Sequence, residues 1–396
     1  MVLAVKDNDA PLLLDVSRMV WRRWTGTRST GIDRICHAWI EHYGPRAQAV
    51  IIHRHGQAIL PFQTSQVLFK LLTLPERARG DVMRFRMALG ALAVRRGAHL
   101  RDRLDGRGRF WLNPGHTGLD RLGVAEWVRR RHLRPIHLVH DLIPITHPQF
   151  CREGEDERHR RRMRTVLDTA SGVVANSAHT LDTLREFAVA EERMLPPTTV
   201  AWPGTPALPS VPPQPDGEPT FVILGTIEGR KNHALLLAVW RQLLSGEGIA
   251  TKPRLLIVGR RGWQADDVFA ELDSGAFGDS IVELGPLDDN RLADVLSRSR
   301  ALLFPSIAEG YGIPLVEALA AKVPVIANDL PVFREIGQGV PELLPADDLA
   351  AWQDAICDYA KDQSPHRLAQ VSRLEGFRVP GWPEHFAQID ALLQTL

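Results

Sequence analysis

Two glutamates, Glu309 and Glu317, flank a glycine-punctuated segment that follows an apolar run at 301–304. The run predicts a buried strand, and the segment after it predicts a loop that opens a helix. That loop consists of Gly310, Tyr311, Gly312 and Ile313. Glycines let backbone approach a ligand closely, and amides at a helix N-terminus favour phosphate. Because carboxylates accept hydrogen bonds from vicinal diols, the two glutamates suit a sugar or a ribose beside that phosphate.

A second chemical segment contains two adjacent cations, Arg230 and Lys231, a few residues after the apolar run 221–224 and Gly225. Lysine offers a point charge and arginine a planar fork, and together they suit a diphosphate. The alternative is a pair of solvated cations at the start of a helix, which is the unfavourable end of the helix dipole for positive charge. The sequence therefore predicts a diphosphate site at 225–233.

A histidine, His140, ends a third apolar run at 136–139 and is followed by Asp141 and Pro144. A lone histidine at a strand end is often structural. Its place at a sheet edge, with a carboxylate beside it, favours a role in the site.

The elements that must position these groups follow a strand–helix rhythm in both halves of the chain. Nine short apolar runs, typical of buried parallel strands, alternate with helical patterns. They lie at 12–14, 49–52, 136–139, 172–175, 221–224, 255–258, 280–283, 301–304 and 324–327. A chain of 396 residues exceeds one usual core, so the pattern predicts an α/β protein with two doubly wound domains.

The domain limits follow from composition. Prolines crowd the stretch between 195 and 220, which predicts a linker. We therefore expect a first domain at 1–198, a linker at 199–218, a second domain at 219–376 and a final amphipathic helix at 377–396 that begins near Trp382.

Two segments carry a resemblance to a known family. The run Glu-Gly-Tyr-Gly-Ile-Pro-Leu-Val-Glu-Ala from 309 and the run Gly-Thr-Ile-Glu-Gly-Arg-Lys-Asn-His from 225 resemble the signatures of retaining glycosyltransferases of family 4. The resemblance implies the GT-B fold: two Rossmann-like domains, a deep cleft between them and a C-terminal helix that crosses back to the first. The first domain would bind the acceptor and the second the nucleotide sugar.

The resemblance also implies roles for individual residues. Glu309 would contact hydroxyls of the transferred sugar and Glu317 the ribose, while Arg230 and Lys231 would hold the donor phosphate. The donor site would further include Thr226 and the loop 310–313.

Other site residues follow from weaker matches to the family. Gly31, in a Thr/Gly run at 25–34, would face the donor across the cleft, and His140 would lie beside the transferred sugar. Arg260 and Leu287 would border the nucleotide base, although the glycines before them are equally consistent with plain strand-ending turns. Gly229 stands where this branch of the family commonly has proline, a difference that affects the rigidity of the loop and leaves its charges intact.

By resemblance to bacterial mannosyltransferases, we expect a retaining hexosyltransferase of surface-polysaccharide biosynthesis, with GDP-mannose as the first choice of donor. A UDP- or dTDP-sugar is the alternative donor, and a nucleotide-sugar-binding protein without turnover is the alternative function. The acceptor would be a saccharide or a lipid-diphosphate-linked saccharide. We expect no metal and no cofactor, because Asp288 and Asp289 are adjacent and no Asp-x-Asp lies in a strand-end loop of the donor domain.

Charge is divided unevenly between the halves: residues 1–200 hold 32 Lys and Arg against 21 Asp and Glu, and the remainder hold 16 against 26. The basic half suits an anionic acceptor or membrane surface, and we expect no nucleic-acid partner. The stretch 67–109 is either a helix lying on a membrane or a cationic helix packed on its own domain. Three scattered cysteines and the lack of a signal peptide predict a cytoplasmic protein, with the inner face of the membrane as an option.

Overall fold

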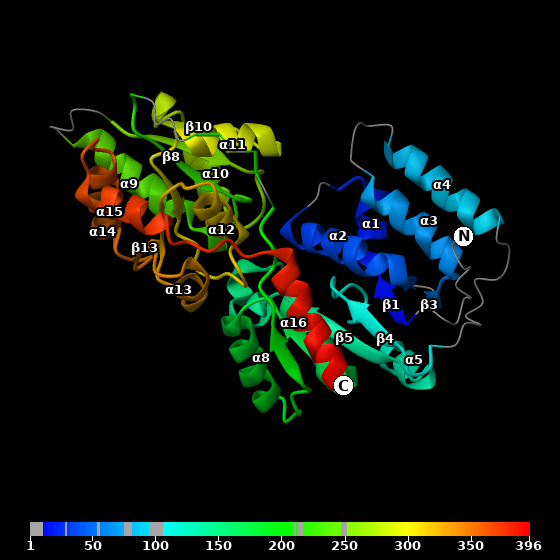
Figure 1. The fold of residues 1–396 in the computed structure, drawn as a ribbon. Helices are drawn as coiled ribbons and strands as arrows, with labels where there is room; N and C mark the ends of the chain where they lie inside the picture. The colour runs from blue at the N-terminus through cyan, green and yellow to red at the C-terminus, as the bar shows by residue number, and fades with distance from the viewer. Residues whose placement is uncertain are drawn as a thin grey trace.

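Two parallel sheets, each covered by helices on both faces, form the computed structural model of the chain (Figure 1). The structure describes residues 11–27, 30–53, 56–74, 81–95, 106–206, 208–209, 211–212, 217–246 and 252–396. The fold class predicted from the sequence, two doubly wound α/β domains, is confirmed.

The first sheet has seven strands in the order β3-β2-β1-β4-β5-β6-β7, and only β3 runs antiparallel to its neighbour. These strands are β1 (Leu12–Asp15), β2 (Ala47–His53), β3 (Gly56–Ile59), β4 (Phe110–Asn113), β5 (Arg134–Val139), β6 (Gly172–Ala175) and β7 (Thr198–Val200). β1, β4, β5 and β6 are buried over nearly their whole length, as expected for a sheet with helices on both faces.

Helices of the first domain divide between the two sheet faces. They are α1 (Ser17–Thr25), α2 (Gly31–Tyr43), α3 (Phe62–Thr73), α4 (Asp81–Arg95), α5 (Val124–Arg130), α6 (Ile143–Thr146), α7 (Glu155–Thr169) and α8 (Ala178–Ala190), with the 3-10 turns η1 (Gly44–Arg46) and η2 (Pro148–Phe150). Helices α1 to α4 share one hydrophobic core, and α5, α7 and α8 share the core on the opposite face. Residues 67–73 and 81–95 of the basic stretch thus belong to α3 and α4, and 75–80 and 96–105 lie outside the described residues.

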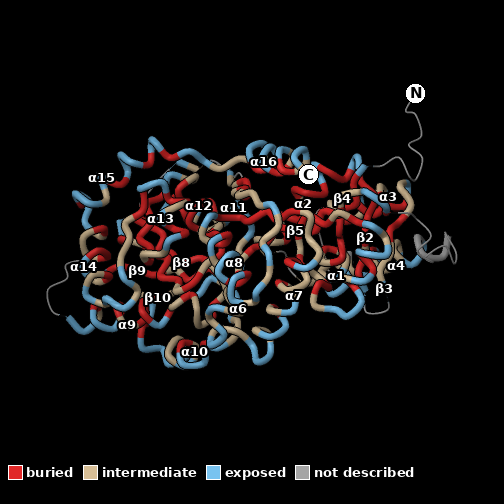
Figure 2. Tube along the Cα trace, turned by 90° about the horizontal axis from the view of Figure 1, so that it is seen from below, coloured by how far each residue is buried: buried red, intermediate tan, exposed pale blue. Residues whose placement is uncertain are grey.

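The second sheet has six parallel strands in the order β10-β9-β8-β11-β12-β13. They are β8 (Thr220–Leu224), β9 (Arg254–Val258), β10 (Ile281–Glu283), β11 (Ala301–Phe304), β12 (Val325–Asn328) and β13 (Glu342–Leu344). Its helices and turns are η3 (Gly229–Lys231), α9 (His233–Ser245), α10 (Asp266–Asp273), η4 (Gly278–Ser280), α11 (Asp289–Arg298), α12 (Ile313–Ala320), α13 (Pro331–Gly337), α14 (Leu349–Tyr359) and α15 (Pro365–Leu374). Figure 2 shows the buried strands at the centre of each domain and the exposed segments around them.

The last helix, α16 (Trp382–Thr395), leaves the second domain and lies along the first (Figure 1). Phe386, Ile389 and Leu392 enter the same core as Trp39 of α2. The indole N–H of Trp39 donates to Nε2 of His385 over 3.0 Å, and Nδ1 of His385 lies 3.1 Å from the carbonyl oxygen of Ala201. The final helix is therefore part of the first domain's core.

In the second sheet the strand order reverses between β8 and β11, which lie side by side. Ligands of open α/β sheets bind beyond the carboxyl ends of the strands at such a point. The loop that contains Arg230 follows β8, and the loop that contains Glu309 follows β11. Topology therefore brings the two predicted segments to one place.

Candidate active site between the two domains

The loop after β11 owes its shape to glycine. Gly312 caps α12 in the left-handed region, with φ of 98°, and a Cβ there would lie 2.9 Å from the ring of Phe333. In the part of the chain that the structure describes, the amides of Gly312 and Ile313 donate no hydrogen bond within the protein. They lie at the N-terminus of α12, where the helix dipole favours an anion.

The loop after β8 presents the two cations to the same loop. Arg230 Nε lies 2.7 Å from Glu228 Oε1, and its Nη1 lies 3.0 Å from both Glu309 Oε1 and the carbonyl oxygen of Ala308. Lys231 Nζ also donates to Glu309 Oε1. The structure thus brings Arg230, Lys231 and Glu309 into direct contact.

The side chain of Lys231 packs against the backbone of a second glycine, Gly225. Gly225 has φ of 136°, and a Cβ at this position would lie 3.3 Å from Lys231 Cε. Thr226 follows in the same loop, and its methyl group faces Gly262, where a Cβ would lie 2.5 Å away. A bulkier residue at Gly225 would therefore displace the lysine.

Burial and charge act in opposite directions on this cluster. Burial favours the neutral form of Glu309, but Arg230 and Lys231 outweigh it and lower the pKa of its carboxyl to about 2. Burial raises the pKa of Glu228, and the neighbouring Arg230 opposes that change. Burial also lowers the pKa of the Lys231 ammonium, and Glu309 works against this shift. We infer that Lys231 and Glu309 are both charged at neutral pH, because each side chain is the counter-ion of the other.

Glu317 lies one helical turn further along α12 and contacts the other domain. Its side chain is 6% exposed, and Oε1 accepts a hydrogen bond of 2.6 Å from Arg34 Nη1 of α2. The second nitrogen of Arg34 donates to Asp289 Oδ1, at the start of α11, over 2.8 Å. Burial raises the pKa of Glu317, and the neighbouring Arg34 offsets only part of this increase. Glu317 therefore lies in the site without touching Arg230 or Lys231.

The carbonyl edge of β5 meets the Glu309 loop across the domain boundary. A Cβ on Gly310 would lie 2.0 Å from the carbonyl oxygen of His140, so only glycine fits here. The Gly310 carbonyl accepts hydrogen bonds from Ser177 Oγ over 2.8 Å and from Thr180 Oγ1 over 3.1 Å. Ser177 also caps α8 by accepting from the amide of Thr180. Ser177 therefore both caps α8 and ties the two domains together.

The His140 ring itself is buried and lies 2.7 Å, through Nε2, from the carbonyl oxygen of Pro114. Burial lowers the pKa of His140 to about 4, so the ring is neutral near pH 7. His116 lies beside it, with ring centroids 5.1 Å apart. The His140 ring is therefore neutral, and the part of this residue that meets the Glu309 loop is its backbone carbonyl, beside Gly310.

Two further predicted residues face each other across the domain boundary. Gly31 is the first residue of α2, and a Cβ there would lie 2.5 Å from Ile313 Cδ1 at the start of α12. Tyr311 is buried, and its hydroxyl donates over 3.3 Å to the carbonyl of Pro203 in the linker. The Tyr311 side chain thus points at the linker, which leaves its backbone as the part that can meet a donor.

The residues predicted to border the base are less closely assembled. Arg260 follows β9 with an exposed side chain, and Leu287 packs partly against the core around α12. Asp288, next to Leu287, caps α11 by accepting from the amide of Arg291 over 2.9 Å. The structure places both residues on the rim of the second sheet and brings them into no mutual contact.

A pocket of about 220 Å³ opens between the domains beside Glu309. Its apolar wall includes Leu142, Ile143, Ile307, Leu330 and Pro331, and its polar lining includes Asp141, Thr146, His147, His179, Thr183 and Glu309. Apolar walls with a few convergent polar groups are typical of small-molecule sites. The pocket adjoins the residues that the sequence assigns to the transferred sugar.

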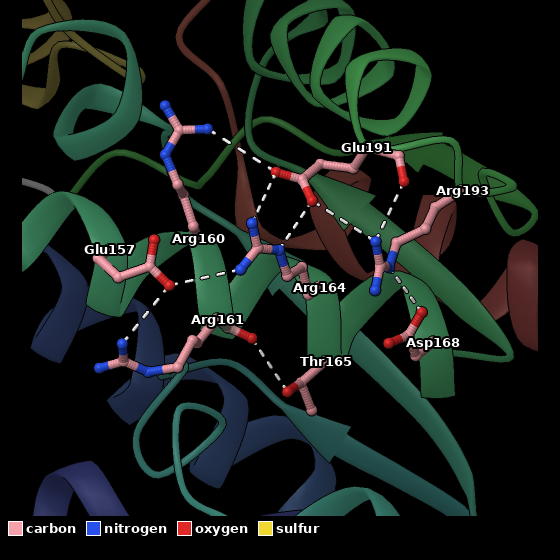
Figure 3. Close-up of polar contacts among 8 residues, drawn as sticks. All are labelled: Glu157, Arg160, Arg161, Arg164, Thr165, Asp168, Glu191 and Arg193. Carbon is pink, nitrogen blue, oxygen red and sulfur yellow. Dashed lines mark hydrogen bonds and ion pairs between the residues drawn. The ribbon is translucent and has the colours of Figure 1, made fainter.

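Much of the positive charge of the first domain is paired with acids. On α7, Arg160 and Arg164 both contact Glu191, as Figure 3 shows, and Arg193 joins the same carboxylate. Arg161 contacts Glu157 of its own helix. These arginines are thus largely neutralised by their neighbours. Among the described residues, no helix is long and apolar enough to cross a membrane, and no cluster of three or more metal-ligating side chains is found.

Residues 218–362 match the protein-family model described as "Glycosyl transferases group 1". The second domain is a group 1 glycosyltransferase domain. This domain contains the β8 and β11 loops, so the cations and both glutamates of the site belong to it. The match confirms the glycosyltransferase domain that the sequence predicts in the second half of the chain.

The chain has relatives that are named as bacterial mannosyltransferases. The chain is 30% identical over 250 residues to "Serotype-specific mannosyltransferase WbdA" of Escherichia coli, which covers 58% of this chain and 30% of that protein. It is 41% identical over 78 residues to "O-antigen chain mannosyltransferase RfbU" of Salmonella typhimurium, 20% of this chain and 22% of that one. The chain thus spans under a third of the length of these relatives.

Solved structures confirm the GT-B architecture over nearly the whole chain. Sucrose-phosphate synthase from Thermosynechococcus elongatus aligns with 97% of this chain and 98% of its own, with a TM-score of 0.59 and 18% identity. Anabaena Alr3699/HepE in complex with UDP-glucose aligns with 97% and 99%, with a TM-score of 0.64 and 13% identity. At these identities the likeness establishes the fold.

Sequence reasoning missed three side chains that shape the site. Arg34 and Asp289 bridge the domains at Glu317, and Glu228 holds the guanidinium of Arg230. Glu228 stands two residues before Arg230 in the motif, so the sequence offered it as a possible partner. The contact of Arg34 with Glu317 joins residues 283 positions apart, and no spacing rule reaches that far.

Proposed function

We propose that the chain is a retaining glycosyltransferase that moves a hexose from a nucleotide sugar to a saccharide or lipid-linked saccharide in bacterial polysaccharide biosynthesis. The observation that carries the proposal is the contact of Arg230 and Lys231 with Glu309, beside bare helix amides in a glycosyltransferase domain. Cations and amides suit a diphosphate, and a carboxylate suits the hydroxyls of the attached sugar.

The proposed reaction needs charge stabilisation at the leaving group. As the bond from the anomeric carbon to the diphosphate oxygen breaks, negative charge grows on the diphosphate. Arg230, Lys231 and the amides of Gly312 and Ile313 would stabilise this charge without a metal ion. The acceptor hydroxyl would attack from the same face and give its proton to the departing diphosphate, which retains the anomeric configuration.

We propose GDP-mannose as the donor, because the relatives that match 20–58% of the chain are named as mannosyltransferases. A UDP-sugar is the alternative donor, and it is supported by neighbours of the same fold that were solved with UDP or UDP-glucose. The neutral imidazole of His140 and the pocket at Asp141 would border the transferred sugar and the acceptor. The reaction would take place in the cytoplasm, at the inner face of the membrane where the acceptor is lipid-linked.

Purified protein tests the proposal when it is incubated with GDP-mannose, UDP-glucose and dTDP-rhamnose, with nucleoside diphosphate release and NMR of the product as readouts. We expect release from one donor, an unchanged anomeric configuration and activity that survives EDTA. Release that is lost in both Lys231→Ala and Glu309→Ala supports the site. Full activity in both variants contradicts it.

A second candidate function is a nucleotide-sugar-binding protein without turnover. The buried pairing of Glu309 with two cations is the observation that favours it, because the carboxylate is already occupied. Tight nucleotide binding without release or hydrolysis of any donor, in the presence of saccharide acceptors, would establish this alternative.

A further inference from the structure

Arg34 is the one side chain of the first domain, within the described residues, that forms a hydrogen bond or ion pair with either glutamate of the candidate site. It lies in the first turn of α2, and its guanidinium spans two elements of the second domain: Glu317 on α12 over 2.6 Å and Asp289 on α11 over 2.8 Å. The fork geometry of arginine permits both contacts at once. The predicted ribose site is thus joined to the opposite domain by a single residue.

The surroundings of Arg34 hold it in this position. The capping box of Thr30 and Asp33 fixes the first turn of α2, and the amide of Thr30 donates to Asp33 Oδ2 over 2.7 Å. Arg18 donates to the other oxygen of Asp33, also over 2.7 Å. Gly31 lets this turn approach Ile313 closely. The guanidinium is therefore presented by a rigid helix end rather than by a loop.

Glu317 depends on Arg34 for its charge. Its carboxylate is 6% exposed, and burial favours the neutral form. The charged groups that act on it are Arg34 from α2, which stabilises the ion, and Asp289 from α11, which opposes it. Arg34 bonds only Oε1, and in the described part of the chain Oε2 accepts no hydrogen bond from the protein. One oxygen is thus held by the arginine and the other is left for a ligand.

We propose that Arg34 is a positioning residue for the nucleotide, which holds Glu317 ionised and oriented from the opposite domain so that its second oxygen receives the ribose hydroxyls. This inference rests on the proposed function, since it assumes a nucleotide at Glu317. On this proposal the second domain makes the direct contacts with the nucleotide. The ribose site is complete only when the first domain lies against it, because that domain supplies Arg34.

The alternative role for Arg34 is inhibitory: its guanidinium would occupy Glu317 and compete with the nucleotide for that carboxylate. The two effects differ in sign. A positioning residue strengthens nucleotide binding, so its removal weakens binding, whereas removal of an inhibitory residue tightens binding. The free Oε2 favours the first.

The test measures the affinity of the full chain for GDP, UDP and dTDP by calorimetry between pH 5.5 and 8, and continues with whichever nucleotide the wild type binds. We expect Arg34→Gln to raise the Kd about tenfold at pH 7.5, comparable to the loss of one charge-assisted hydrogen bond. We expect the loss to grow as the pH falls, because Glu317 without its counter-ion takes up a proton at higher pH than in the wild type. Arg34→Lys should restore part of the affinity and of the pH profile.

Two comparisons separate this role from a merely structural one. Glu335→Gln weakens a different contact between the domains, in which Glu335 Oε1 accepts from the amide of Ala178 over 2.8 Å, because an amide oxygen is a poorer acceptor than a carboxylate. This variant should keep the wild-type pH profile. In a double-mutant cycle, Arg34→Gln should add little to the loss caused by Glu317→Gln. Circular dichroism and melting curves confirm that each variant is folded.

The outcomes are distinct. Wild-type protein that binds none of the three nucleotides overturns the proposed function itself. Wild-type binding together with unchanged or tighter binding by folded Arg34→Gln overturns the role of Arg34 and leaves the proposed function in place. Additive losses in the cycle, or the same pH profile for Arg34→Gln and Glu335→Gln, also overturn it.

Discussion

Lys231 donates a hydrogen bond to Glu309 across two loops that lie 78 residues apart in the sequence. The two side chains are 8% and 9% exposed, and each balances the charge of the other. A nucleoside diphosphate that enters beside it would draw the ammonium toward phosphate and release the carboxylate for sugar hydroxyls. One contact thus couples the two halves of the proposed donor.

Replacement of Lys231 tests this coupling. Lys231→Met keeps the length of the side chain over Gly225 and removes its charge, so the diphosphate loses one of its stabilising groups. We expect kcat/KM for the active donor to fall roughly 10²–10³-fold, as for other preorganised charge-stabilising donors. Steady-state kinetics measures the effect, and a melting curve checks the fold. Arg241→Gln, an exposed arginine of α9, is the matched control, and an equal loss in that variant would count against the assignment.

Gly310→Ala tests the close approach of the two domains. The added Cβ would lie 2.0 Å from the carbonyl oxygen of His140, and a backbone atom cannot move aside as a side chain can. We expect a folded protein whose kcat is lower by about 10²-fold, because small displacements of reacting groups have effects of this size. Gly90→Ala in α4, where a Cβ meets nothing within 4 Å, should behave as the wild type. Normal kcat in Gly310→Ala would mean that the loop position is not critical.

The stability of the fold should fall as the medium becomes acidic. Burial lowers the pKa of His137 and His233 to about 3 and of His140 and His385 to about 4, against an ordinary value of 6.5. Between 6.5 and these values the unfolded chain binds protons that the folded chain does not. As the pH falls through this range, each histidine therefore lowers the free energy of unfolding by about 1.4 kcal/mol for every pH unit.

Asp15 opposes this trend, because burial raises its pKa to about 7 and its protonated form is favoured in the fold. Burial likewise raises the pKa of Glu228 and Glu317, but it also lowers the pKa of four further histidines, His42, His116, His147 and His159. Because the histidines outnumber these carboxyls, we expect the melting temperature to fall from pH 6.5 to pH 4.5. Differential scanning calorimetry measures the change, and His385→Gln should show a shallower pH dependence than the wild type. A melting temperature that is flat over this range would contradict the expectation.

Phe386→Ala tests the contribution of α16 to the first domain. The ring is buried in the core with Trp39 and stacks on His42 at a centroid distance of 3.9 Å. Its loss should lower the free energy of unfolding by about 3–5 kcal/mol. Denaturant unfolding measures the change, and Gln388→Ala, on an exposed position of the same helix, should have little effect. Equal stability of the two variants would mean that α16 is dispensable for that core.

The sequence predicts the fold well because its signal is local. All nine apolar runs overlap observed strands, although those at 280–283 and 324–327 each begin one residue before the strand. The start of the predicted linker at 199–218 is part of β7, the last strand of the first sheet. Strands β3, β7 and β13 were not predicted, because they are short or only partly buried and lack a continuous apolar run. β4 was missed for another reason: Phe110–Asn113 directly follows a basic stretch that interrupts the rhythm.

The candidate site is predictable only where one loop carries several of its groups. Arg230, Lys231 and Glu309 could be assigned from the loops after two strands, since parallel topology brings strand ends together. The directions in which the side chains point could not be predicted from the sequence. The hydroxyl of Tyr311 reaches the linker, and Arg34 reaches Glu317, through packing between distant parts of the chain.

The position of α16 has a consequence for the order in which the protein folds during synthesis. Domains of a nascent chain generally fold in turn, starting from the N-terminus. Here the first domain emerges from the ribosome before the side chains of α16 that pack with Trp39, and its core stays incomplete until residues 382–395 have been translated. The second domain is therefore made while apolar side chains of the first are still exposed to chaperones.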